Sequence, residues 1–222
     1  MGRTLRVEGV PIGVTPRPDN MTVGRPGTPR LAKRGGLVPL EELVRLGTAR
    51  PIVRWGDPVL HRPCRRVIEF NSELWALLCD MFATNRSAEG VGLAAPQIGV
   101  DWAVFVFDCP DGFGRRRQGL VCNPHLALLA NPKMDIDFEG CLSLPGAYAP
   151  LSRPSVAVVH GQDQLGRPIR IAGSGLLARC LAHETDHVNG IVMEDHLPAN
   201  ERRDLRRQYK EVDASFPEDW PR

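Results

Sequence analysis

Two histidines four positions apart, His183 and His187, form the strongest chemical pattern in the chain, with Glu184 beside the first. On an α-helix this spacing brings both imidazoles to one face, where their nitrogens can bind one metal ion. Glu184 would lie about 80° from that face, close enough to reach a water molecule at the metal without being a ligand. The pattern therefore predicts a metal-dependent enzyme.

The segment around these residues has the signals of a helix. Ser174 can cap its start, Asn189-Gly190 can end it, and no proline lies between them. At about 100° per residue, one narrow stripe holds the residues that such a helix would bury: Leu176, Cys180, His183 and His187. Buried imidazoles need partners for their ring nitrogens, and a metal can be one. The alternative is a pair of core histidines bonded to carbonyl groups.

A third protein ligand must come from elsewhere in the chain. Cys141, in the segment Glu139–Ser143, is the best candidate, because a thiolate with two imidazoles leaves a fourth tetrahedral position open. An ordinary buried thiol is the alternative interpretation. Cys180 lies three residues before His183 and would sit beneath that histidine, so we expect it to pack or to line a pocket wall.

A run of small residues, Gly90–Gln97, ends in a side-chain amide. Glycines allow a backbone to approach a ligand closely, as the edge that binds a peptide must. Gln97 could donate a hydrogen bond to a developing oxyanion. Taken alone, the run is more typical of a tight loop than of a binding site.

Composition sets the class of protein. With 222 residues, 42% apolar and 24% charged, the chain can form one sizeable core. A net charge of +2 gives no electrostatic argument for binding DNA or a membrane. Without a long apolar run or a signal-peptide core, we expect a cytoplasmic protein whose six scattered cysteines are reduced thiols.

The sequence predicts three regions. Residues 1–48 contain six prolines and no aromatic residue, so we expect a mostly disordered extension in which only Leu37–Leu46 could form a helical turn or two. Residues 49–200 would form the catalytic domain, and residues 201–222 a charged C-terminal helix and tail.

The coarse pattern predicts an α+β fold, in which antiparallel strands pack around the late metal-binding helix. A helix should start at Asn71 or Ser72 and run through Ala83. Its inward residues would be Leu74, Leu77, Leu78, Met81 and Phe82. Buried strands are expected at 103–107 and 120–122, and a hairpin at 155–160 and 168–171.

Together, three segments resemble the signature motifs of peptide deformylases, in the same order: Gly90–Gln97, Glu139–Ser143 and His183–His187. Weaker similarity extends from Gly56 to about Pro198. The resemblance implies a hydrolase that removes the N-formyl group from the N-terminal formyl-methionine of nascent polypeptides and releases formate.

The resemblance also implies a role for each residue of the site. The metal ligands would be Cys141, His183 and His187, with Glu184 as general base and then general acid. Gln97 and the backbone N–H of Leu142 would bind the oxyanion. The substrate-binding residues would be Val91, Gly92, Gly140 and, beside the methionine side chain, Cys180. The metal would be Fe²⁺, although this donor set also binds Zn²⁺, Ni²⁺ or Co²⁺.

Two other functions compete with this hypothesis. A His-Glu-x-x-His metallopeptidase would take a third ligand further along the chain, and Asp195 and His196 are the nearest candidates. A non-catalytic protein that binds metal or formyl-peptides would be expected to lose the general base, yet Glu184 is present.

One further partner is conceivable. A helix over 201–212 would carry Leu205, Tyr209 and Val212 on one side, with arginines and a lysine around it. Such a helix could contact ribosomal RNA transiently. The alternative is a solvated charged face, since acidic residues are interleaved.

Overall fold

The computed structural model describes residues 40–127 and 130–221. Its largest element is an antiparallel five-stranded sheet of order β1-β2-β3-β6-β7, and a separate hairpin pairs β4 with β5. The strands are β1 (Gly92–Ala94), β2 (Val104–Pro110), β3 (Arg116–Leu126), β4 (Met134–Cys141), β5 (Leu144–Pro154), β6 (Val156–Gln162) and β7 (Pro168–Ser174). The helices are α1 (Leu40–Leu46), α2 (Ser72–Ser87), α3 (Leu176–Val188) and α4 (Ala199–Val212). Short 3₁₀ turns are η2 (Pro58–His61), η3 (Ala95–Ile98), η4 (Met193–His196) and η5 (Asp213–Ser215).

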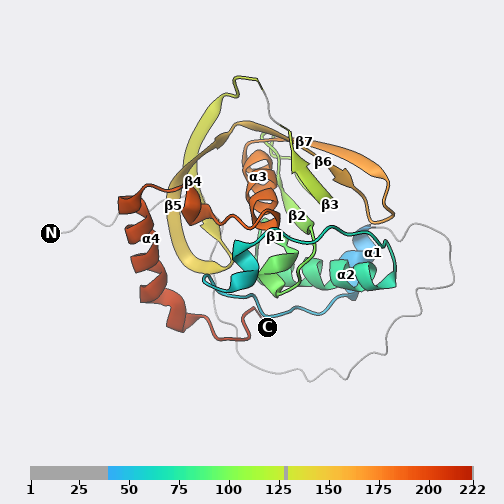
Figure 1. The fold of residues 1–222 in the computed structure, drawn as a ribbon, viewed down its shortest axis with the longest axis horizontal. Helices are drawn as coiled ribbons and strands as arrows, with labels where there is room; N and C mark the ends of the chain where they lie inside the picture. The colour runs from blue at the N-terminus through green and yellow to red at the C-terminus, as the bar shows by residue number, and fades with distance from the viewer. Residues whose placement is uncertain (1–39, 128–129, 222) are drawn as a thin grey trace. The chain divides into compact units, whose positions relative to one another are not determined.

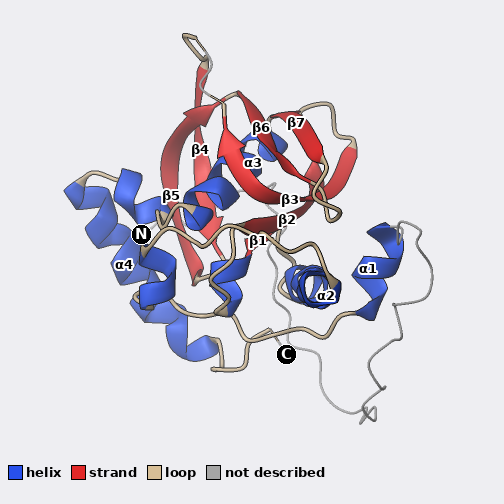
Figure 2. Ribbon diagram, turned by 45° about the vertical axis from the view of Figure 1, so that its right-hand side comes forward, coloured by secondary structure: helices blue, strands red, loops and turns tan. Residues whose placement is uncertain are grey.

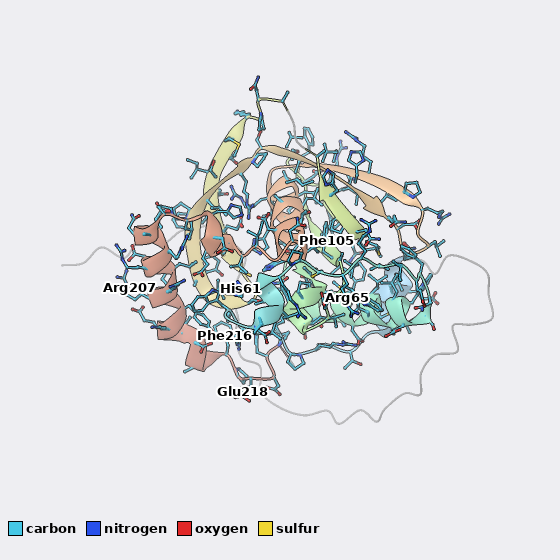
Figure 3. The ribbon with its side chains drawn as sticks, in the orientation of Figure 1. His61, Arg65, Phe105, Arg207, Phe216 and Glu218 are labelled. Carbon is cyan, nitrogen blue, oxygen red and sulfur yellow. The ribbon has the colours of Figure 1, made fainter. Side chains whose placement is uncertain are left out.

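Helix α3 lies between the five-stranded sheet and the hairpin (Figure 1). Its apolar residues Leu177 and Leu181 are fully buried in one cluster with Phe105 of β2, which Figure 3 labels in the interior, and with Val121 and Val159. Figure 2 shows α4 beside the hairpin and α1 and α2 at the other end of this body. The predicted α+β fold with antiparallel strands around α3 is confirmed.

Helix α2 follows the prediction from its cap and apolar period. The Asn71 side chain accepts hydrogen bonds from the backbone N–H groups of Glu73 and Leu74. All five predicted inward residues are buried, and the helix continues past Ala83 to Ser87. The strands and the hairpin predicted between 103 and 171 are also present, each somewhat longer than expected.

The N-terminal boundary needs a correction. Leu40–Leu46 forms α1, and its Leu43 is fully buried in the cluster that includes residues of α2. The backbone N–H of Thr48 donates to Asp80 on α2. The packed chain therefore starts before residue 49, the predicted start of the catalytic domain, and α1 lies within the segment Leu37–Leu46 where a helical turn or two was expected. Residues 1–39 of the predicted disordered extension lie outside the described residues.

The start of α3 also differs from the prediction. Its N-cap is Gly175, with φ 59° and no side-chain cap, so Ser174 does not cap the helix. Leu176 is 39% exposed rather than buried. It is the first residue of α3, and helix side chains tilt toward the N-terminus, where no earlier turn of the helix covers it. The end is as predicted, with Asn189 as C-cap and Gly190 at φ 74°.

The hairpin β4–β5 was not predicted. Residues 134–138 of β4 are all exposed, and only Glu139 and Cys141 at the end of the strand are buried. Helix α4 packs along β5, where the Gln208 amide accepts from the backbone N–H and donates to the carbonyl of Tyr148, both at 3.1 Å. None of the helices described is long and apolar enough to span a bilayer.

Candidate active site

Three predicted metal ligands come together between α3 and the end of β4. The Sγ of Cys141 lies 3.2 Å from Nε2 of His187, which lies 3.1 Å from Nε2 of His183. The three donor atoms are within 4.8 Å of one another, and all three residues are buried. The helix brings the two histidines together, while the third donor depends on how the hairpin packs against that helix.

The donor set fits a metal ion. Nδ1 of His183 is 2.7 Å from Glu139 Oε1, so its proton is used there and the Nε2 lone pair faces the other two donors. Burial raises the pKa of the Cys141 thiol, but the facing rings of His187 and His183 outweigh burial and lower it to about 5. A thiolate and imidazole lone pairs directed at one small space are what a divalent metal requires.

Glu139 is held by a buried ionic network. Arg153 donates to both of its carboxylate oxygens, at 3.1 and 2.8 Å, and Arg179 donates to one of them at 3.1 Å. Burial opposes ionisation, yet His183 and Arg153 hold the pKa of the Glu139 carboxyl well below its usual range. The sequence did not single out either arginine, because nothing in their spacing relates them to Glu139.

Glu184 differs from every other carboxylate near the metal ligands. It is 2% exposed, and its Oε2 has no hydrogen-bond partner among the described residues. Burial raises the pKa of this carboxyl to about 7. A Cβ placed on Gly92 would lie 2.6 Å from Glu184 Oε1 and 2.7 Å from Cys180 Sγ, so any side chain at this position would displace the Glu184 carboxylate or the Cys180 thiol.

Gln97 is oriented toward the metal ligands. Its Oε1 accepts from the backbone N–H of Ala94 at 2.8 Å, which directs Nε2 to a point 3.7 Å from Cys141 Sγ. Leu142 follows Cys141 directly in the turn after β4 and is half-buried. Both predicted oxyanion donors therefore lie next to the predicted metal ligands.

Three of the predicted substrate-binding residues lie on or beside two strands that each have one partner, and the fourth, Cys180, lies on α3. Val91 precedes β1, which pairs only with β2, and Gly140 is on β4, which pairs only with β5, among the described strands. Cys180 donates its thiol proton to the Val91 carbonyl at 3.4 Å, so it lies beneath the first of these edges. Val91 is 39% exposed, whereas Gly92–Ala94 of β1 are buried.

The ligands that a metallopeptidase would use are elsewhere. His196 Nε2 is 2.8 Å from Asp186 Oδ2, and the Asp195 carboxylate accepts from the backbone N–H of Val192 at 2.9 Å. Neither residue belongs to the group of donors around His183 and His187, which Cys141 completes.

A buried thiolate and two imidazoles beside an unpartnered carboxylate define a metal-dependent hydrolase. The family model for polypeptide deformylase matches residues 49–203, and the chain belongs to that family.

Relatives agree with this assignment. Peptide deformylase 1 of Streptomyces avermitilis is 53% identical over 173 residues, which cover 77% of this chain and 80% of that protein. The solved peptide deformylase of Legionella pneumophila is 38% identical with a TM-score of 0.68, covering 77% of this chain and all of that one. The peptide deformylase of Synechococcus elongatus, solved in complex with actinonin, is 34% identical with a TM-score of 0.66. The match covers 74% of this chain and 89% of that one.

Proposed function

We propose that this chain removes the N-formyl group from the N-terminal formyl-methionine of nascent polypeptides and releases formate. The catalytic domain would be residues 49–200, with Cys141, His183 and His187 holding one divalent metal. The observation that carries this proposal is the convergence of three donor atoms within 4.8 Å beside the unpartnered Glu184 carboxylate.

A divalent metal at these donors supplies a Lewis acid that makes water a better nucleophile at neutral pH. Glu184 moves the proton. With a pKa of about 7, its carboxylate can take a proton from the attacking water and return it to the departing amine nitrogen. Because Oε2 has no other partner among the described residues, this transfer breaks no existing hydrogen bond.

Gln97 and Leu142 act on the formyl oxygen. We assign the Gln97 amide and the Leu142 backbone N–H as donors to the negative charge that develops there. The Gln97 amide is already oriented by its bond from Ala94, so little reorganisation is needed during the reaction.

The substrate chain would bind between the two edges described above. Backbone groups of Val91, Gly92 and Gly140 would form its hydrogen bonds, as in strand addition to a sheet edge. Cys180, which lies under Val91, would border the methionine side chain. We propose that this site admits a small formyl group and excludes an internal peptide bond, which is flanked by chain on both sides.

For the metal we propose Fe²⁺. A thiolate with two imidazoles also binds Zn²⁺, Ni²⁺ and Co²⁺, so the donor set alone does not select one. Ferrous iron beside Cys141 predicts loss of activity in air, by oxidation of the metal or of the thiolate. Elemental analysis of protein purified without oxygen tests this directly, and activity that survives prolonged air exposure would contradict it.

We also propose a cytoplasmic location and a transient contact between ribosomal RNA and residues 201–212 of α4, within the predicted C-terminal region 201–222. Arg203, Arg207 and Lys210 are exposed on this helix, and Figure 3 shows Arg207 on its outer side. Arg206 is engaged instead with Glu194, at 3.0 Å.

Because Leu205 is fully buried, charge reversal of Arg203 and Lys210 is a better test of this contact than deletion of the helix. Ribosome co-sedimentation should fall in this variant and with added salt; unchanged co-sedimentation would exclude the contact.

The first experiment is formate release from formyl-Met-Ala-Ser by anaerobically purified protein, with metal content measured on the same sample. An acetylated peptide and a Glu184→Gln variant are the controls. Glu184→Gln should retain the metal and lose on the order of a thousandfold in turnover, because proton transfer is removed while the ligands remain. A metal-replete wild-type protein that releases no formate would refute the proposed function.

A further inference from the structure

Arg179 contacts the hairpin at three points, although it belongs to the helix that carries the histidines. Its Nη1 donates to Glu139 Oε2 at 3.1 Å and to the Leu151 carbonyl at 2.9 Å, and its Nη2 donates to the Asp135 carbonyl at 3.2 Å. The side chain is buried, with 7% of the residue exposed. One guanidinium of α3 is therefore bonded to both strands of the hairpin.

Arg153 connects the same two elements in the opposite direction. From β5 it donates to Glu139 on the neighbouring strand, and its Nη1 donates to Asp186 Oδ2 on α3 at 2.6 Å. Arg153, Arg179, Glu139 and Asp186 are two cations and two anions in contact. Buried charges are tolerated when they are paired and hydrogen-bonded in this way. Loss of one partner leaves the remaining charges buried without compensation for their desolvation.

The metal ligands are divided between the elements that these arginines join. His183 and His187 are four residues apart on α3, so the helix alone fixes their relative positions. Cys141 lies on β4, two residues after Glu139. A small shift of β4 along α3 would therefore move Cys141 away from the histidines without changing the distance between them.

We propose that Arg179 is a positioning residue. By fixing the hairpin on α3, it holds Cys141 facing the two imidazoles, so that all three donors can bind one metal ion. The proposal rests on the proposed metal site of the function above. Arg179 is not one of the three metal donors, and it acts through Glu139 and the two carbonyl groups. Its loss should weaken the thiolate–metal bond more than the imidazole–metal bonds.

The test uses Co²⁺-loaded protein, because the thiolate-to-metal charge-transfer absorption reports Cys141 ligation separately from activity. Arg179→Met keeps most of the side-chain volume and removes every donor. Metal loss to a chelator should become about 10- to 100-fold faster, with a weaker charge-transfer band. Arg179→Lys keeps the charge but cannot reach all three acceptors, so an intermediate rate is expected. Arg170→Met, at an exposed arginine on β7, is the matched control and should behave as wild type.

Metal loss at the wild-type rate from Arg179→Met would overturn the proposal, even with a lower melting temperature, since that result would show a purely structural role. If Arg179→Met does not fold, Arg179→Lys decides, and a wild-type rate in that variant overturns the proposal equally. Wild-type protein that shows neither the charge-transfer band nor formate release would instead refute the proposed function, so the two failures are distinguishable.

Discussion

The two sides of α3 differ in chemistry although they belong to one helix of 13 residues. Toward the five-stranded sheet, Leu177 and Leu181 are fully buried in an apolar cluster. Toward the hairpin, Arg179 and His183 are each 7% exposed, and both bond to Glu139. The two sides are buried to a similar degree. The sheet side is held by apolar contacts, and the hairpin side by hydrogen bonds and ion pairs.

This difference suggests that one side of α3 contributes mainly to folding stability and the other to the geometry of the active site. An apolar contact is non-directional, so the sheet side can tolerate small shifts and contributes mainly to the free energy of folding. A hydrogen-bonded charge depends on distance and angle, so the hairpin side sets the positions of Glu139, His183 and Cys141. Substitutions on the two sides should therefore have separable effects on turnover and on unfolding.

The largest effect on turnover in this comparison should come from Gln97 of η3, which faces the metal ligands on the hairpin side of α3. Gln97→Ala should lower turnover about 10²- to 10³-fold without unfolding the protein, because it removes one donor to the developing oxyanion. Steady-state kinetics with a formyl peptide and a melting curve measure both quantities. Gln97→Glu is the matched control: it keeps an acceptor for the Ala94 N–H but loses the donor, so its turnover should fall as well. Near-native turnover in Gln97→Ala would refute this assignment.

A smaller effect, of the opposite kind, is expected on the sheet side of α3. Leu181→Ala should reduce the free energy of unfolding by about 3 kcal/mol, because it leaves a cavity in a cluster where Leu181 is fully buried. Denaturant unfolding measures this change. Turnover per folded, metal-loaded molecule should stay within about twofold of wild type, and a large fall in it would show that the two sides of α3 are not separable.

The smallest effect on the free energy of unfolding should come from Leu176, the first residue of α3, which is 39% exposed. Leu176→Ala should change the free energy of unfolding by no more than about 0.5 kcal/mol. The sequence predicted this leucine to be buried on the histidine stripe, so the same unfolding experiment distinguishes the two descriptions. A loss as large as that of Leu181→Ala would support the original prediction.

Elements whose local pattern agrees with their environment could be predicted from the sequence. Helix α2 has a capping residue, Asn71, and an apolar period that matches its buried face. The hairpin β4–β5 was missed because the apolar residues of β4 are exposed, Ile136 at 71%, and its only buried residues are Glu139 and Cys141 at the end of the strand, so its alternation marks no core face. The search for strands assumes that apolar residues face the core. That assumption cannot identify a strand whose buried residues belong to the ionic network.

The sequence by itself determined the histidine pair, since residues four apart on any α-helix share a face, and Glu184 beside them. The residues also offered Cys141 as the best third ligand and Gln97 as a possible oxyanion donor. Resemblance to a family then assigned these roles and added Leu142 and the substrate-binding positions. Only the tertiary structure decided that Arg153 and Arg179 meet at Glu139, 14 and 40 residues away along the chain. Local spacing dictates local geometry, whereas contacts between distant residues depend on how the elements that carry them pack together.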